Sequence, residues 1–299
     1  MGLRDVLFGR KKLAEPKEDQ LFALTTAAVT LDTELGLKPA GGAAIAFKPQ
    51  SSGEFRSAFD RVGALLRQVP GDAAHWIQVE SFIPGREFAL EGIVTAGRLQ
   101  VLAIFDKPDP LDGPFFEETI YLTPSRLDAA TQQTLVAATE KAVAAVGLRH
   151  GPVHAEMRLN DGGVWMLEMA ARPIGGLCAR ALRFSGDMPL EELILRHASG
   201  EDISRIEREK QSAGVMMIPI PRAGILEGVD NVGAALATPG IESIEITAKL
   251  GQELVPLPEG SSYLGFIFAR AASPEAVEQA LRAAHGKLGF RITTALRVM

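Results

Sequence analysis

The stretch Gly151-Pro-Val-His-Ala-Glu-Met-Arg-Leu-Asn160 is followed by Asp161-Gly-Gly163, then by Val164-Trp-Met-Leu-Glu-Met-Ala170 and Ala171-Arg-Pro-Ile-Gly-Gly176. Apolar and polar residues alternate along the first segment, as they do in a strand with one buried face. The Asp-Gly-Gly sequence is typical of a hairpin turn. We therefore predict antiparallel strands over residues 153–160 and 164–170.

The register of this hairpin decides which side chains meet. A three-residue turn places Glu156 directly opposite Glu168, and opposed residues share one face of a sheet. Two carboxylates there repel each other unless a cation neutralises them, and Mg²⁺ bound to phosphate oxygens would do so. A two-residue turn would instead place Glu156 opposite Leu167. The pattern also fits a solvated hairpin face, with His154 as a hydrogen-bonded structural residue.

From about Ala58 to its end, the sequence resembles the ATP-grasp superfamily, specifically its carboxylate–amine ligases, which include L-amino acid ligases. The resemblance centres on the two acids twelve positions apart and on Glu168-Met-Ala-Ala-Arg172, where the family typically shows Glu-x-Asn-x-Arg. It implies that Glu156 and Glu168 hold Mg²⁺ (or Mn²⁺) between ATP phosphates, and that Arg172 binds the acyl phosphate or the carboxylate substrate. Ala170 replaces the family's Asn, which leaves open whether one or two metals bind.

Two further segments carry the resemblance. Trp76-Ile-Gln-Val-Glu-Ser-Phe-Ile-Pro-Gly-Arg-Glu-Phe-Ala-Leu-Glu91 resembles the family's hinge strand, and Asp106-Lys-Pro108 with Phe115-Phe-Glu-Glu-Thr119 resembles the acceptor pocket. Lys107 would then face phosphate and Glu118 would orient an amine. Without the resemblance, Glu87 and Glu91 are surface acids, and Lys107 and Glu118 are loop charges. The nucleotide-binding residues implied by the resemblance are Glu80 and the backbone of Ser81, Phe82 and Ile83 for adenine, and Glu87 for ribose.

The family implies an α+β chain with a partial ATP-grasp fold on an antiparallel sheet, plus a small C-terminal α+β domain. We expect three parts, an N-terminal segment 1–53, a nucleotide- and metal-binding domain 54–213, and a ligase-type domain 214–299. Residues 1–55 also resemble small phage-shock-associated proteins. Lys48 is the candidate phosphate-binding lysine before the hinge, unless that second resemblance holds. The short stretch before the match suggests a missing N-terminal domain and slow activity.

The composition limits the function classes. The 299 residues carry a net charge of -6, and the absence of a basic face argues against nucleic acid as a partner. One cysteine, Cys178, excludes an internal disulfide and fits the reducing cytoplasm. No apolar stretch approaches the length of a spanning helix. We therefore expect a cytoplasmic ATP-dependent ligase that joins a small carboxylate, such as an amino acid, to an amine through an acyl phosphate. The alternative is a non-catalytic nucleotide-binding module; a homo-oligomer stays open.

Overall fold

The computed structural model describes residues 22–25, 52–66, 78–112, 117–257, 260 and 262–294. The chain divides into two compact units, residues 1–82 and 83–299. In the first unit, strand β1 (Phe22–Thr25) pairs antiparallel with β2 (Gln78–Ser81), and helix α2 spans Ser52–Leu66.

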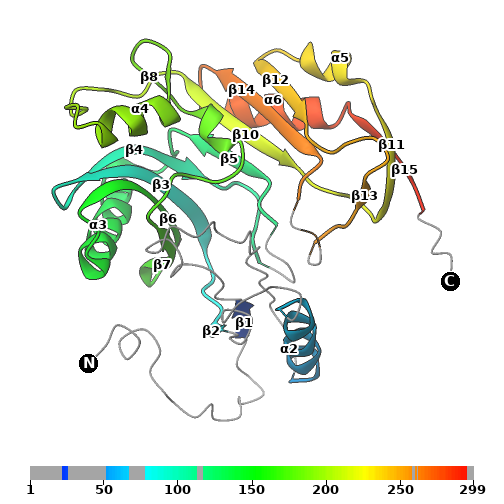
Figure 1. Cartoon of the computed structure of the whole chain (residues 1–299), viewed down its shortest axis with the longest axis horizontal. Helices are drawn as coiled ribbons and strands as arrows, with labels where there is room; N and C mark the ends of the chain where they lie inside the picture. Colours follow the sequence, from blue (N-terminus) through cyan, green and yellow to red (C-terminus); the bar gives the residue numbers. More distant parts are fainter. Residues whose placement is uncertain are drawn as a thin grey trace. The chain divides into compact units, whose positions relative to one another are not determined.

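The second unit is built on an eight-stranded antiparallel sheet with the order β12-β14-β10-β5-β4-β3-β6-β7 (Figure 1). Its strands in chain order are β3 (Arg86–Thr95), β4 (Arg98–Asp106), β5 (Ile120–Thr123), β6 (His150–Asn160), β7 (Gly163–Ala170), β10 (Ser212–Ile218), β12 (Ile241–Ile246) and β14 (Gly265–Ala271). The sheet runs without a break across residues 213 and 214, so the boundary predicted there falls inside β10. The predicted division into three parts stays a prediction.

Smaller elements surround this sheet. A second sheet has the order β13 (Glu253–Leu254), β11 (Gly224–Asp230), β15 (Gly289–Thr293), and β8 (Arg183–Phe184) pairs with β9 (Met188–Pro189). The helices of this unit are α3 (Ala129–Val146), α4 (Leu190–Ala198), α5 (Val232–Leu236) and α6 (Pro274–His285), with a 3₁₀ turn over Cys178–Ala181. Among the helices that the structure describes, none combines enough length and apolar character to cross a membrane.

Strands β3 and β4 are covered on both faces. Phe88 and Leu90 pack with Leu135 of α3 on one face, whereas Ala89 packs with Leu193 of α4 on the other. Figure 1 shows α3 and α4 on opposite sides of these strands. A strand buried on both faces leaves no water for polar side chains, so each charge on it needs a partner inside the protein.

The N-terminus of helix α3 is capped by a side chain. Asp128 is the N-cap and accepts a hydrogen bond from the Thr131 N–H at 2.9 Å. Ser125, three residues earlier, donates to buried Asp106 at 2.6 Å. The helix ends at Gly147, which adopts φ 73°, the left-handed conformation that glycine tolerates best.

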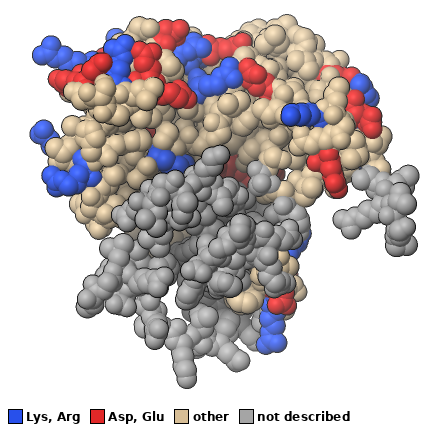
Figure 2. All heavy atoms as spheres, viewed as in Figure 1, with Lys and Arg blue, Asp and Glu red and all other residues tan. Residues whose placement is uncertain are grey.

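The surface of the described residues carries mixed charge. Figure 2 shows basic and acidic side chains intermingled on the visible face. Ion pairs join several of the charged side chains of the described residues, such as Arg183 with Glu242 at 3.0 Å and Arg196 with Glu192 at 2.7 Å.

Candidate active site

The register of β3 and β6 gathers five charged residues on one face of the sheet. Glu87 pairs with Arg158, Ala89 with Glu156, and Glu91 with His154. Since successive side chains of a strand alternate between faces, Glu87 and Glu91 share a side, as do His154, Glu156 and Arg158. Both sets lie on the side of Ala89, toward α4 and the 3₁₀ turn.

Lys107, directly after β4, is the centre of the cluster. Its buried Nζ lies 2.8 Å from Glu87 Oε1 and 2.7 Å from Glu156 Oε1, and it also pairs with Glu118. Burial alone would lower the pKa of Lys107, but the charges of Glu118 and Glu156 raise it well above its ordinary value. Lys107 is therefore a permanent positive charge that holds three carboxylates together.

Carboxylate oxygens of Glu87, Glu118 and Glu156 all lie within 4.8 Å of one another. Hard divalent cations prefer such oxygen donors, and in this structure the Lys107 ammonium lies among them. The two acids on either side of Lys107 differ in acidity: burial raises the pKa of Glu118, whereas burial of Glu156 is outweighed by Lys107 and His154, which hold its pKa well below the usual range. Glu156 thus stays ionised, and Glu118 takes up a proton more readily.

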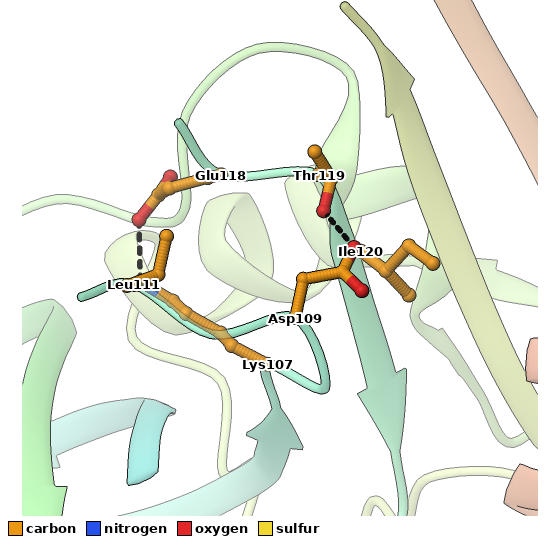
Figure 3. A pocket seen from close by; sticks show the side chains of 6 residues that line it. All are labelled: Lys107, Asp109, Leu111, Glu118, Thr119 and Ile120. Atoms are coloured by element: carbon orange, nitrogen blue, oxygen red, sulfur yellow. Dashed lines mark hydrogen bonds and ion pairs between the residues drawn. The ribbon is translucent and has the colours of Figure 1, made fainter. Parts of the chain in front are cut away.

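A small pocket opens beside Lys107 (Figure 3). In that view the side chains of Lys107 and Glu118 point toward each other, and Thr119 points toward Asp109. The pocket is lined by Lys107, Asp109, Leu111, Glu118, Thr119 and Ile120. It brings together the two residues that the sequence assigns to the acceptor site.

The predicted pairing of Glu156 with Glu168 is confirmed, but for a different reason from the one given by the sequence. The turn holds two residues, because Asn160 pairs with Gly163. A bulge next to Glu156 leaves Leu167 unpaired and restores the register, so that Glu156 lies opposite Glu168. The prediction of a three-residue turn is wrong, and the bulge cancels its effect.

The opposed acids have different surroundings. Glu156 is half-buried in the Lys107 cluster, whereas the Glu168 side chain is 47% exposed and lies 3.6 Å from Arg172, itself 53% exposed. Arg172 also donates to the Pro173 carbonyl at 3.0 Å. Glu168 is outside the three-carboxylate group, so its role as a metal ligand stays a prediction.

The predicted nucleotide-binding residues are distributed over both units. Both carboxylate oxygens of Glu87 are engaged, Oε1 by Lys107 and Oε2 by Arg158 Nε at 2.9 Å. The Ile83 carbonyl accepts a hydrogen bond from Arg158 at 2.7 Å. Of the rest, Glu80 and Ser81 lie in β2, Phe82 follows it half-buried, and Lys48 is outside the described residues. Their roles stay predictions.

The pairing of Glu91 with His154 was missed from the sequence. Glu91 is only 1% exposed and accepts from His154 Nδ1 and from the Ile174 N–H at 3.0 Å. Burial disfavours the charged imidazole, but hydrogen bonds and charges of Glu156 and Glu91 raise the pKa of His154 to about 9. The available signal was the sequence Phe-Ala-Leu-Glu-Gly-Ile-Val, an acid within an apolar strand, because such an acid has to find a partner.

Comparison with known proteins agrees with this geometry. An ATP-grasp domain model matches residues 47–181, and a model of L-amino acid ligase C-terminal domain 2 matches residues 216–293. The resemblance to ATP-grasp ligases therefore holds over these two segments. A third model, PspA associated protein B, matches residues 1–81 and overlaps the ATP-grasp match. Both resemblances seen in the sequence are thus confirmed.

Among solved structures, the L-amino acid ligase of Bacillus licheniformis has a TM-score of 0.75 and 26% sequence identity to this chain. The match covers 98% of this chain and 67% of that one. The predicted α+β, ATP-grasp fold is therefore confirmed. The biotin carboxylase domain of a Hydrogenobacter thermophilus enzyme, solved with MgADP, is 15% identical with a TM-score of 0.61, covers 91% of this chain and 58% of that one, and supports the fold alone.

Two curated relatives match this chain over shorter spans. Carnosine synthase 1 of Gallus gallus is 30% identical over 53% of this chain and 18% of its own length. Alanine–anticapsin ligase of Bacillus subtilis is 32% identical over 35% of this chain and 21% of its own length. A third relative, an uncharacterized protein of Sinorhizobium fredii, is matched over 44% of its length. The chain therefore spans less than half the length of each of these three relatives.

Proposed function

We propose that the chain is an ATP-dependent carboxylate–amine ligase, which forms an amide through an acyl phosphate. The observation that carries the proposal is the Lys107 cluster, in which Glu87, Glu118 and Glu156 bring three carboxylate oxygens within 4.8 Å of one another around one buried ammonium group. Arg158 also pairs with Glu87, whereas Glu118 and Glu156 share Lys107. A divalent cation beside these two acids would neutralise the charge that Lys107 leaves.

The donor set fits Mg²⁺ or Mn²⁺. Lys107, Tyr121 and His154 all contact Oε1 of Glu156, at 2.7, 3.2 and 3.3 Å. No hydrogen-bond donor from the described residues lies on its Oε2, so that oxygen points to a ligand role. Glu118 and the opposed Glu168 would complete the protein's share of the coordination. A bound Mg²⁺ would neutralise phosphate charge during transfer.

Arg172, Lys107 and Glu118 would bind the anionic groups and transfer the proton. The Arg172 side chain is 53% exposed and pairs with the similarly exposed Glu168. Its guanidinium can therefore turn from Glu168 to a carboxylate or acyl phosphate and bind it through two parallel hydrogen bonds. Lys107 offers a fixed point charge beside the same acids. Glu118, whose pKa burial raises, is suited to accept a proton from the attacking ammonium group.

Binding of ATP would use the hinge. The Glu80 carboxylate and the backbone of Ser81, Phe82 and Ile83 would bind adenine, and Glu87 would bind the ribose. The substrates would be an amino acid as the carboxylate and a second amino acid or related amine. A cytoplasmic location, as the single cysteine suggests, would supply both ATP and these substrates.

The test incubates the purified chain with ATP, Mg²⁺ and pooled amino acids, and measures ADP by coupled assay and products by mass spectrometry. We expect ADP release that depends on an amino acid, and a product whose mass is the sum of two substrates minus water. Binding of ADP or ATP without any product would instead favour a non-catalytic nucleotide-binding module.

A further inference from the structure

Two buried residues, Glu91 and His154, connect the proposed metal ligand Glu156 to the loop after β7 that carries Arg172. Glu91 on β3 and His154 on β6 lie opposite each other in the register, and both are less than 5% exposed. Both side chains are therefore too buried to contact a substrate. Their partners, however, are parts of the proposed site.

The imidazole of His154 bridges two carboxylates. Its Nδ1 pairs with Glu91 Oε1, and its Nε2 lies 3.3 Å from Glu156 Oε1. Since His154 and Glu156 are two residues apart on one strand, they share a face and this contact needs no distortion. The contact holds Glu156 by the oxygen that also faces Lys107, and leaves Oε2 to a cation.

The second oxygen of Glu91 reaches the loop after β7. Its Oε2 accepts the backbone N–H of Ile174 at 3.0 Å. Ile174 is buried and lies two residues after Arg172, at the start of the Ile174-Gly-Gly176 turn. One buried carboxylate therefore ties down the backbone next to Arg172 while it orients the histidine behind Glu156.

We infer that Glu91 and His154 are positioning residues that set the geometry between the metal-binding Glu156 and the loop that carries Arg172. This inference rests on the proposed function. Residues behind metal ligands fix ligand orientation, and their loss typically weakens metal affinity by about 10- to 100-fold. A pair with a purely structural role would change stability and leave metal affinity alone.

The experiment titrates Mn²⁺ into the full chain with ADP present and follows free Mn²⁺ by electron paramagnetic resonance. His154→Gln should weaken Mn²⁺ affinity about 10-fold or more, while ADP affinity without metal stays the same. Glu91→Gln, which keeps the size and an acceptor for Ile174, should act in the same direction by a smaller factor. The double variant should lose no more than His154→Gln alone, because both residues act through one chain of contacts.

His197→Gln is the matched control. His197 is also buried, and its Nε2 is 2.9 Å from Thr95 Oγ1, but it contacts none of the site acids. Its substitution should lower thermal stability and leave Mn²⁺ affinity unchanged. Amide hydrogen exchange at Ile174 gives a second readout, and should speed up in Glu91→Ala, which removes the acceptor.

The Mn²⁺ titrations distinguish failure of the proposed function from failure of the positioning role of Glu91 and His154. If the unaltered chain binds no Mn²⁺ with ADP, the proposed function and the inference fall together. If it does, and folded His154→Gln binds Mn²⁺ within twofold of it, only the positioning role is refuted. Failure of both Glu91→Gln and His154→Gln to fold, with His197→Gln folded, would refute it too, because the pair would then be structural.

Discussion

Replacement of Lys107 by methionine tests the electrostatic arrangement of the site. The substitution keeps most of the side-chain volume and removes the charge that lies 2.8 Å from Glu87 and 2.7 Å from Glu156. Arg158 still neutralises Glu87, but Glu118 and Glu156 lose their strongest partner. Removing one member of a buried ion pair costs about 3–5 kcal/mol. For a protein of this size, that lowers the melting temperature by roughly 6–20 °C.

The loss should depend on pH in a defined direction. Without Lys107, the buried carboxylates of Glu118 and Glu156 repel each other in the folded state, which raises their pKa values above those in the unfolded chain. The folded variant then binds more protons than the unfolded one, and its stability rises as pH falls. We expect the deficit relative to the parent to be full near pH 8 and to shrink toward pH 5.

Urea unfolding followed by circular dichroism at both pH values measures this deficit. Lys141→Met is the control, because Lys141 is exposed on α3 and its loss should change stability by less than about 0.5 kcal/mol. A loss below about 1 kcal/mol for Lys107→Met, or an equal loss at the two pH values, would refute the reasoning.

Three further predictions concern single side chains. Glu168→Gln should weaken Mg²⁺-dependent nucleotide binding and leave stability unchanged, since its side chain is exposed; equal affinities by calorimetry would remove Glu168 from the metal site. Arg172→Ala should change the free energy of unfolding by less than about 1 kcal/mol but lower turnover about 100-fold or more; an unchanged rate in the ADP assay would argue against its anion-binding role. Burial raises the pKa of the Cys178 thiol to about 12, so iodoacetamide at pH 8 should label it only after unfolding in urea; rapid labelling of the native chain would contradict this burial.

The hairpin of β6 and β7 could be predicted only in part from the sequence. The alternation of Val153 to Asn160 predicts the strand, and the Asp-Gly-Gly sequence predicts the reversal. The turn length and the bulge both shift the register by one residue, in opposite directions. Neither leaves a mark in the residue pattern, because a bulge depends on how the two strands twist together. The opposition of Glu156 and Glu168 was therefore predicted from reasoning that was only half right.

The cluster around Lys107 marks the limit of the sequence. The resemblance to ATP-grasp ligases indicated Lys107, Glu118 and Glu156 as separate candidates. It did not predict that both carboxylates contact the Lys107 ammonium group. That convergence needs β3, β4 and β6 to be neighbours, a long-range pairing that local patterns do not specify. Glu91 was interpreted as a surface acid for the same reason, because its partner lies 63 positions along the chain.

An isotope-labelling experiment tests most directly whether the reaction passes through an acyl phosphate. An amino acid whose carboxylate carries a heavy isotope of oxygen is incubated with the chain, ATP, Mg²⁺ and an amine, and the released phosphate is analysed by mass spectrometry. An acyl phosphate forms when the carboxylate oxygen attacks the transferred phosphoryl group, and the amine then displaces phosphate with that oxygen attached. We expect one labelled oxygen in each phosphate released with product. Unlabelled phosphate would mean that water attacks ATP directly, and would refute the acyl phosphate intermediate.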